Sequence, residues 1–292
     1  MDRHTIDNYA WFLMKTLTLF SFFLLFFIII TIFYKSLPLI NKIPLITLLL
    51  SSQWYPLRGD FGFFSFIIGS ILVTIIAMVI AIPISLFVSI YLSEYSSKRV
   101  RKKVKPLIDL LAGIPSVIFG LWGVSTIVQM IRYQIAPFFN LSTTGYCVLS
   151  AGVVLAVMVL PLIISLSYEV MSSVPTEMRE TSIALGATRW QTAKHVIIRD
   201  SSRGILAAIV LGFTRAFGET MAVLMVVGNQ AKVPSSLFEP AYPLPSLIAN
   251  NFGEMMSLPL YDSALMFAAL ILLVIVSFFI IISRQLQIHL LR

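Results

Sequence analysis

Apolar residues along this chain fall into long runs that are separated by shorter polar stretches. A helix needs about 20 apolar residues to cross a bilayer, and six runs are long enough. They predict an all-α, polytopic membrane bundle with six transmembrane helices. The expected spans cover about 16–34, 63–92, 107–131, 146–168, 204–229 and 263–283. The first run is too long for a signal peptide, so we expect it to remain as the first span.

Composition supports a membrane protein and excludes a soluble domain. Hydrophobic residues make up 58% of the 292 positions and charged residues only 12%, whereas soluble domains carry about 25% charged residues. The net charge of +8 does not indicate nucleic-acid binding, because the positive residues follow the topology of the spans. The single cysteine, Cys147, rules out an intrachain disulfide framework, and we expect a buried, inert thiol.

Lysine and arginine predict the orientation of the chain. Fifteen of the 21 lie in the two termini and in the loops 98–105 and 169–203, and five lie on the other side of the six spans. The positive-inside rule therefore places both termini in the cytoplasm. The basic loop 98–105 is either a topology determinant alone or also a binding site for anionic membrane lipid.

The predicted organisation has three parts. Residues 1–62 hold the N-terminal segment, the first span and an external loop, residues 63–284 form the core with five spans, and residues 285–292 form a cytoplasmic tail. Prolines and glycines inside spans are expected to kink or break helices. These positions are Pro83, Gly113, Pro115 and Pro161.

The loop 169–203 is long for a compact bundle, and long loops usually carry a function. Pro175 favours a helix start, and Gly186 favours a left-handed stop. A second helix is expected from about Thr188, with Trp190, Ala193 and either Val196 or Ile197 on one face. This pattern predicts two short helices that dock into a groove of a cytoplasmic partner.

The stretch "ETSIALGATRWQTAKHVI" resembles the EAA loop of ABC-importer permeases, which docks on the ATPase subunit. Two departures from that pattern are the Thr-Ser pair in place of Ala-Ala and Arg199 in place of the terminal proline. The resemblance implies coupling roles for Glu180, Thr181, Ser182, Gly186 and Ala187.

Further stretches, including "GIPSVIFGLWG" and "LGFTRAFGETMAVLMVVGN", resemble the PstC family of phosphate-specific permeases. That resemblance implies a type I, MetI-like permease in the bacterial inner membrane that imports inorganic phosphate. It also implies a second permease of the PstA type, two cytoplasmic ATPase subunits and an extracytoplasmic phosphate-binding protein. A different oxyanion (molybdate, tungstate or sulfate) and a membrane scaffold or sensor stay open as alternatives.

Catalysis by the chain itself is not expected. It has no G-x-x-x-x-G-K-[ST] phosphate loop, so ATP and magnesium would be used by a separate subunit and this chain needs no cofactor. Its histidines are scattered along the sequence, and no metal site is predicted. These are His4, His195 and His289.

Two charged residues, Arg215 and Glu219, lie inside the predicted span 204–229. On one continuous helix they share a face, and each would cost about 2.5–3.5 kcal/mol if it faced lipid. Three interpretations stay open from the residues alone: a structural ion pair, an anion site on Arg215 that Glu219 orients, and a proton or gating relay through Glu219. The family resemblance favours the anion site, since it implicates both positions in phosphate translocation. Small residues beside them predict close packing by another helix. They are Gly204, Ala208, Gly212 and Ala216.

The segment 229–262 is long and rich in proline. It is expected either to dock the binding protein, together with the loop 35–62, or to form a re-entrant cap in which Glu239 and Glu254 are merely solvated.

Overall fold

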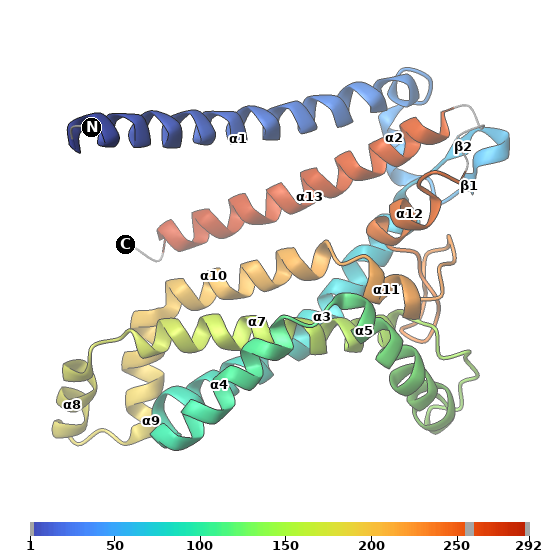
Figure 1. The fold of residues 1–292 in the computed structure, drawn as a ribbon. Coiled ribbons are helices and arrows are strands. Elements are labelled where there is room, and N and C mark those ends of the chain that lie inside the picture. Colours follow the sequence, from blue (N-terminus) through green and yellow to red (C-terminus); the bar gives the residue numbers. More distant parts are fainter. Residues whose placement is uncertain (1–2, 255–259, 290–292) are drawn as a thin grey trace.

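The computed structural model describes residues 3–254 and 260–289 of the chain, most of them in helices (Figure 1). The N-terminal third contains α1 (Arg3–Ile40), α2 (Leu45–Leu50), β1 (Trp54–Tyr55), η1 (Pro56–Arg58), β2 (Asp60–Phe61), α3 (Phe64–Ile90) and η2 (Tyr91–Tyr95). The middle contains α4 (Lys98–Ala112), α5 (Ser116–Trp122), η3 (Gly123–Val128), η4 (Ile131–Ile135), α6 (Ala136–Phe138) and α7 (Val148–Ser172). The rest comprises α8 (Thr176–Ala184), α9 (Arg189–Thr192), η5 (Ala193–Ile197), α10 (Ile198–Phe217), α11 (Met221–Val226), α12 (Leu244–Asn251) and α13 (Tyr261–His289).

Helix α7 is the centre of the bundle. Its most apolar 18-residue window is 67% buried inside the chain, whereas that of α1 is 0% buried. Helices α3, α4 and α10 all pack along α7. The central core includes Val154, Leu155 and Met158 of α7, and Cys147 is buried there as predicted.

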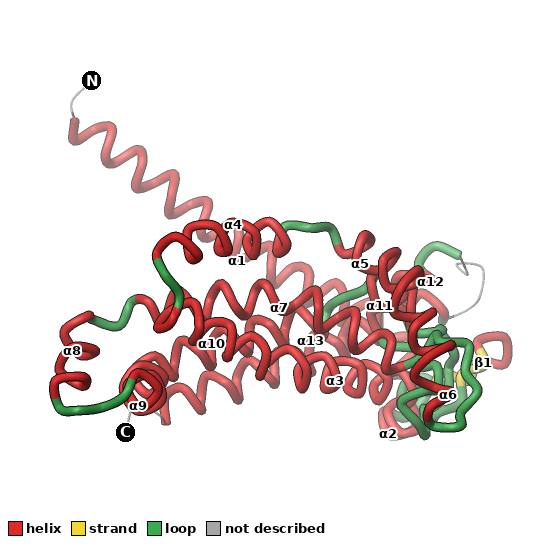
Figure 2. The backbone as a smooth tube through the Cα atoms, turned by 90° about the horizontal axis from the view of Figure 1, so that it is seen from below, coloured by secondary structure: helices red, strands yellow, loops and turns green. Residues whose placement is uncertain are grey.

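The other long helices form successive layers outside this core. Helix α13 packs on α10, and α1 packs on α13 (Figure 1). Figure 2 shows the N-terminal half of α1 standing apart from the other helices. Helix α1 therefore exposes most of its apolar surface in the single chain, as expected of a helix in contact with lipid or with another subunit.

An aromatic cluster joins the far ends of α3 and α13. The strands β1 and β2 pair in an antiparallel hairpin, which places Trp54 opposite Phe61. The Trp54 ring lies 4.9 Å from the Phe66 ring and 6.2 Å from the Tyr261 ring, measured between centroids. These contacts anchor the loop between α1 and α3 to the start of α13.

Two of the six predicted spans are not single helices. Among the described residues, four helices are long and apolar enough to cross a membrane, or five if the bent pair Lys98–Ala112 and Ser116–Phe138 counts as one span. That pair bends by 92° at Gly113–Pro115, so the prediction of one helix over 107–131 is wrong, although the glycine and proline named above mark the break. Helices α3 and α7 continue through Pro83 and Pro161.

The prediction of one helix over 204–229 is also wrong. Helix α10 ends at Phe217 and α11 begins at Met221. Helix α10 does not qualify as a span by its apolar character, because it includes four charged residues, Arg199, Asp200, Arg203 and Arg215.

Helix α1 begins, and α13 ends, at the end of the bundle where α8 lies (Figure 1). This arrangement agrees with the prediction that the two termini and the loop 169–203 share one side. Within the predicted tail 285–292, residues 290–292 lie outside the described residues, as do 255–259 of the segment 229–262.

Candidate functional site

The packing of α10 on α7 positions Arg215. A Cβ atom on Gly204 would lie 2.2 Å from Val170 Cγ1, and one on Gly212 would lie 2.6 Å from Ile163 Cγ1. The predicted stripe of small residues is thus confirmed as the contact between the two helices. A larger side chain at either position requires α10 to move away from α7, or the side chain of Val170 or Ile163 to leave its place.

Arg215 lies on a neighbouring face of α10, in its last turn. Ala207 and Leu211 share this face one and two turns earlier, and both are exposed in the single chain. Arg215 is half-buried beside these exposed residues, and none of the ion pairs between described residues includes it. The chain therefore presents this arginine on a surface that its own helices leave open.

Glu219 lies in the break after α10 and does not share a helical face with Arg215. The amide of Gly218 donates to the carbonyl of Thr214 at 3.2 Å, and the chain then leaves the helix. The Glu219 carboxylate accepts a hydrogen bond from the Ala222 amide at 3.4 Å. The expectation of an i, i+4 arrangement was wrong because Gly218 ends the helix one residue before Glu219.

Beyond α11 the chain turns back at Gly228 and Asn229, which have φ angles of +90° and +49°. Asn229 Nδ2 donates to the carbonyl of Leu224 at 2.8 Å, while its Oδ1 is buried with no hydrogen-bond partner in the described part of the chain. Sequence reasoning missed Asn229. An Asn after a Gly at the end of an apolar run was the available signal for this turn.

The segment after Asn229 folds onto the start of α7. Carbonyls of Glu239 and Leu237 accept from the amides of Val148 and Leu149, at 3.0 and 2.9 Å. These bonds satisfy amides in the first turn of α7, which have no partner inside the helix. The described part of 229–262 is thus a cap bound to the end of the bundle.

Glu239 is more than merely solvated. Its carboxylate accepts from the backbone amide of Ser235 at 3.1 Å and from the Ser235 hydroxyl at 2.9 Å, and Lys232 Nζ lies 3.5 Å away. These hydrogen bonds, from the Ser235 amide above all, lower the pKa of Glu239 below its ordinary value.

At the opposite end, the loop 169–203 forms the first predicted short helix, whereas the prediction that the second helix is also short is wrong. Helix α8 follows Pro175, and Gly186 ends the segment with a φ of +86°. Thr188 caps α9 in a reciprocal capping box with Gln191. The second helix continues without interruption from α9 through η5 into α10, with Ala193 and Ile197 buried and Trp190 exposed.

The residues matched to the EAA pattern lie on α8 and the turn that follows. Glu180 and Thr181 are exposed, whereas Ser182 is half-buried and its hydroxyl lies 3.0 Å from that of Thr192. The amide of Ala187 donates to the carbonyl of Ser182 at 3.2 Å. Exposed apolar side chains surround these residues, and Leu185 is 83% exposed.

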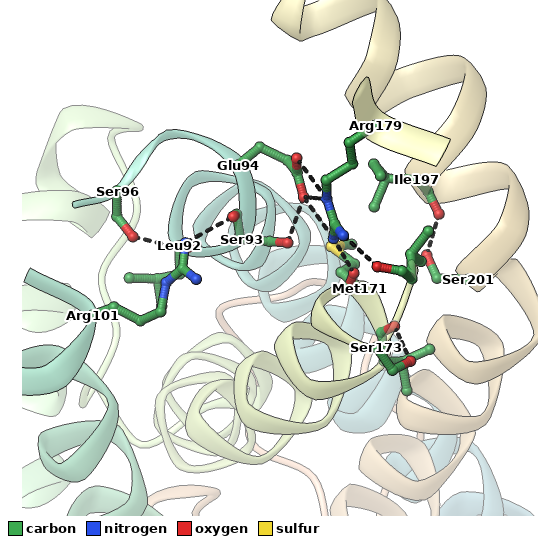
Figure 3. Close-up of polar contacts among 12 residues, drawn as sticks. Leu92, Ser93, Glu94, Ser96, Arg101, Met171, Ser173, Arg179, Ile197 and Ser201 are labelled. Atoms are coloured by element: carbon green, nitrogen blue, oxygen red, sulfur yellow. Dashed lines mark hydrogen bonds and ion pairs between the residues drawn. The ribbon is translucent and has the colours of Figure 1, made fainter. Parts of the chain in front are cut away.

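The ion pair between Arg179 and Glu94 beneath α8 was not predicted from the sequence. Arg179 Nη2 lies 3.3 Å from Glu94 Oε1, with the two side chains only 18% and 11% exposed (Figure 3). The residues are 85 positions apart, so periodicity gives no signal that they meet. Arg179 entered the sequence analysis only as one positive charge among the fifteen.

Comparisons with known proteins agree on the kind of molecule. The model of the family "binding-protein-dependent transport system inner membrane component" matches residues 81–291. A probable ABC transporter permease, YqgH of Bacillus subtilis, is 39% identical over 85% of this chain and 80% of its own length. The phosphate transport system permease PstC of Xylella fastidiosa is 35% identical over 83% and 78%. A probable PstC of Methanocaldococcus jannaschii is 34% identical over 89% and 88%.

Solved structures show the same fold at lower identity. A subunit of a bacterial alginate ABC transporter aligns with a TM-score of 0.66 and 16% identity, covering 97% of both chains. A chain of the inward-facing MetNI methionine transporter aligns with a TM-score of 0.59 and 16% identity, covering 77% of this chain and 94% of that one.

Proposed function

The chain belongs to the family of binding-protein-dependent transport system inner membrane components and, within it, to the PstC phosphate permeases; from this premise we propose how it works. It is the permease subunit of an ABC importer for inorganic phosphate, and it forms one half of the path through the membrane. The observation that carries this proposal is the open face of α10, on which Arg215 has no ion-pair partner among the described residues.

A second permease would cover that face. An arginine facing lipid at midplane costs about 2.5–3.5 kcal/mol, whereas an arginine facing a polar path between two subunits keeps its hydration. Ala207 and Leu211 on the same face are exposed in the single chain and suit close contact with another helix. We assign this surface to a homologous permease of the PstA type.

Arg215 is the group that would meet phosphate. A guanidinium binds two oxygens of an oxyanion at once, and the Glu219 carboxylate is occupied by the Ala222 amide. This geometry argues against the structural ion pair, and equally against the expectation that Glu219 orients the guanidinium. We therefore propose an anion site on Arg215 that Glu219 does not hold in place. Glu219 lies only a few residues away, and its negative charge would keep the site weak enough for release.

The loop at the α8 end would couple transport to ATP. Leu185, Ile183 and Trp190 are exposed apolar residues on or beside α8 and α9, as expected of a helix pair that docks into a groove. Glu180, Thr181, Ser182, Gly186 and Ala187 lie in the same small surface. We propose that one of two cytoplasmic ATPase subunits, which bind ATP and magnesium, docks on this surface, and that this chain is not itself catalytic.

The opposite end would receive a phosphate-binding protein. The cap over 229–254 and the loop 35–62 both lie at the end opposite to α8 (Figure 1), and the positive-inside rule places that end outside the cell. Both termini and the α8 loop would then be cytoplasmic, in a bacterial inner membrane.

Uptake of radiolabelled phosphate tests the proposal. The chain is expressed with its partner subunits in bacteria that lack phosphate uptake, and Arg215→Gln is compared with Arg99→Gln, which changes an exposed arginine of the basic loop 98–105. Arg215→Gln loses charge-assisted hydrogen bonds of about 1.5–3 kcal/mol, which predicts uptake that is at least about tenfold lower. The control variant should take up phosphate as fast as the unaltered protein. Sulfate and molybdate are added as competitors.

Equal uptake by Arg215→Gln and the unaltered protein would assign Arg215 a structural role. Competition by molybdate or sulfate would point to a different oxyanion. An absence of any transport from a correctly assembled complex would leave the scaffold alternative.

A further inference from the structure

Helix α8 is attached to the bundle with little packing of its own. It has nine residues and no buried side chain, and only Arg179 and Ser182 are even half-buried. A cavity of about 380 Å³ lies beneath it, lined by residues of α8, α9, η2, α4 and the last residue of α7. A short helix without a buried apolar face is not stable alone, so specific side-chain contacts must hold α8 in place.

Arg179 provides most of these contacts (Figure 3). Its Nη2 donates to the carbonyl of Met171 at 2.7 Å, and its Nη1 donates to the carbonyl of Val174. Met171 lies in the last turn of α7 and Val174 lies two residues beyond its end, where a positive charge is favourable. Its Nε and Nη2 also donate to the Glu94 carboxylate at 3.3 Å.

Glu94 is itself held in one orientation. It lies in η2, a π turn that ends α3, and its Oε1 accepts from Ser93 Oγ at 2.6 Å. Arg101 Nη2 donates to the carbonyl of Ser93 at 2.8 Å, which ties the same turn to α4. Because both members of the pair are largely buried, salt screens it less than an exposed pair.

We propose that Arg179 and Glu94 form the tie that passes movement of α8 to the ends of α7 and α3. This inference rests on the proposed function, since α8 is there the helix that the ATPase moves. Helix α7 is also the helix on which Gly204 and Gly212 pack, so displacement of its end would be passed to α10, the helix that carries Arg215. Arg179 and Glu94 are positioning residues and do not touch the transported anion.

The test uses the whole complex, with partner permease, ATPase subunits and binding protein, in proteoliposomes. The measured quantity is phosphate imported per ATP hydrolysed. Glu94→Gln keeps the size of the side chain and removes its charge. We expect the ratio to fall about fivefold or more, in the range of ordinary coupling between sites, while the ATPase subunits still co-purify. Glu94→Asp restores the carboxylate and should recover part of the ratio.

A matched control exists at the same end of the bundle. Lys105 Nζ and Glu169 Oε1 form an ion pair at 3.0 Å, with side chains 37% and 53% exposed, and it links α4 to α7 without involving α8. Lys105→Gln should leave the ratio unchanged. An unchanged ratio in Glu94→Gln, an equal fall in Lys105→Gln, or loss of the ATPase subunits from Glu94→Gln would each overturn the proposal.

A distance measurement separates the tie from the substrate assignment. Spin labels on Glu177→Cys of α8 and Phe87→Cys of α3 occupy two exposed positions. If Arg179 and Glu94 connect the helices, the distance between the two labels stays the same when ATP is added to the protein that keeps Glu94. In the protein that also carries Glu94→Gln, the distance changes when ATP is added. A constant separation in both proteins would refute the tie whichever anion is imported, whereas failure of the unaltered complex to import phosphate would count against the substrate alone.

Discussion

Replacing Gly212 by valine tests whether close packing of α10 on α7 supports the site. The first added carbon would lie 2.6 Å from Ile163 Cγ1 and 3.2 Å from Val159 Cγ1, whereas carbon atoms in contact lie about 3.5–4.0 Å apart. The helices must therefore separate by about 1 Å, or Ile163 must leave its place in the core. Overpacking of this kind costs about 1–3 kcal/mol.

The assay is the free energy of unfolding of the purified chain in mixed micelles, with Ala207→Val as the control. Ala207 lies on the same helix but is exposed in the single chain, so we expect its valine variant to differ little from the unaltered protein. If Gly212→Val is no less stable than Ala207→Val, the reasoning from the α10–α7 contact fails.

Two further outcomes follow from surfaces outside the spans. Leu185→Glu places a charge on the most exposed apolar residue of the α8 loop and should abolish co-purification of the ATPase subunits without unfolding the chain; retained binding would show that the ATPase docks elsewhere. The lowered pKa of Glu239 means that its ionised form stabilises the cap above the unfolded-state pKa, and this contribution is lost as pH falls through the lower, folded-state pKa. Thermal stability of the unaltered chain should thus decline at acid pH more than that of Glu239→Gln, and parallel profiles would contradict this.

Much of the fold was predictable because apolar runs and turn residues are local signals. The long spans, the Gly113–Pro115 break and the glycine stop at Gly186 all come from neighbouring residues and their backbone preferences. The stripe of small residues on α10 was also predictable, because positions four apart share a helical face.

The remaining features depend on contacts between distant segments. Glu94 and Arg179 meet only because α3 and α7 end side by side, and no spacing in the sequence indicates this. The break after Phe217 was missed because an apolar run of this length reads as one helix, although Gly218 lies within it. A glycine inside an apolar run is often accommodated in a helix, and here the following Glu219 takes a backbone partner beyond the break.

The low apolar character of α10 has a consequence for biosynthesis. Helix α10 includes four charged residues and does not qualify as a membrane span by itself, whereas α7 does and is made first. The glycines of α10 fit against Val170 and Ile163 of α7, so the surface on which α10 packs has already been synthesised when α10 leaves the ribosome. We therefore expect α10 to enter the bilayer already paired with α7, and the order of these segments along the gene to be a requirement for insertion.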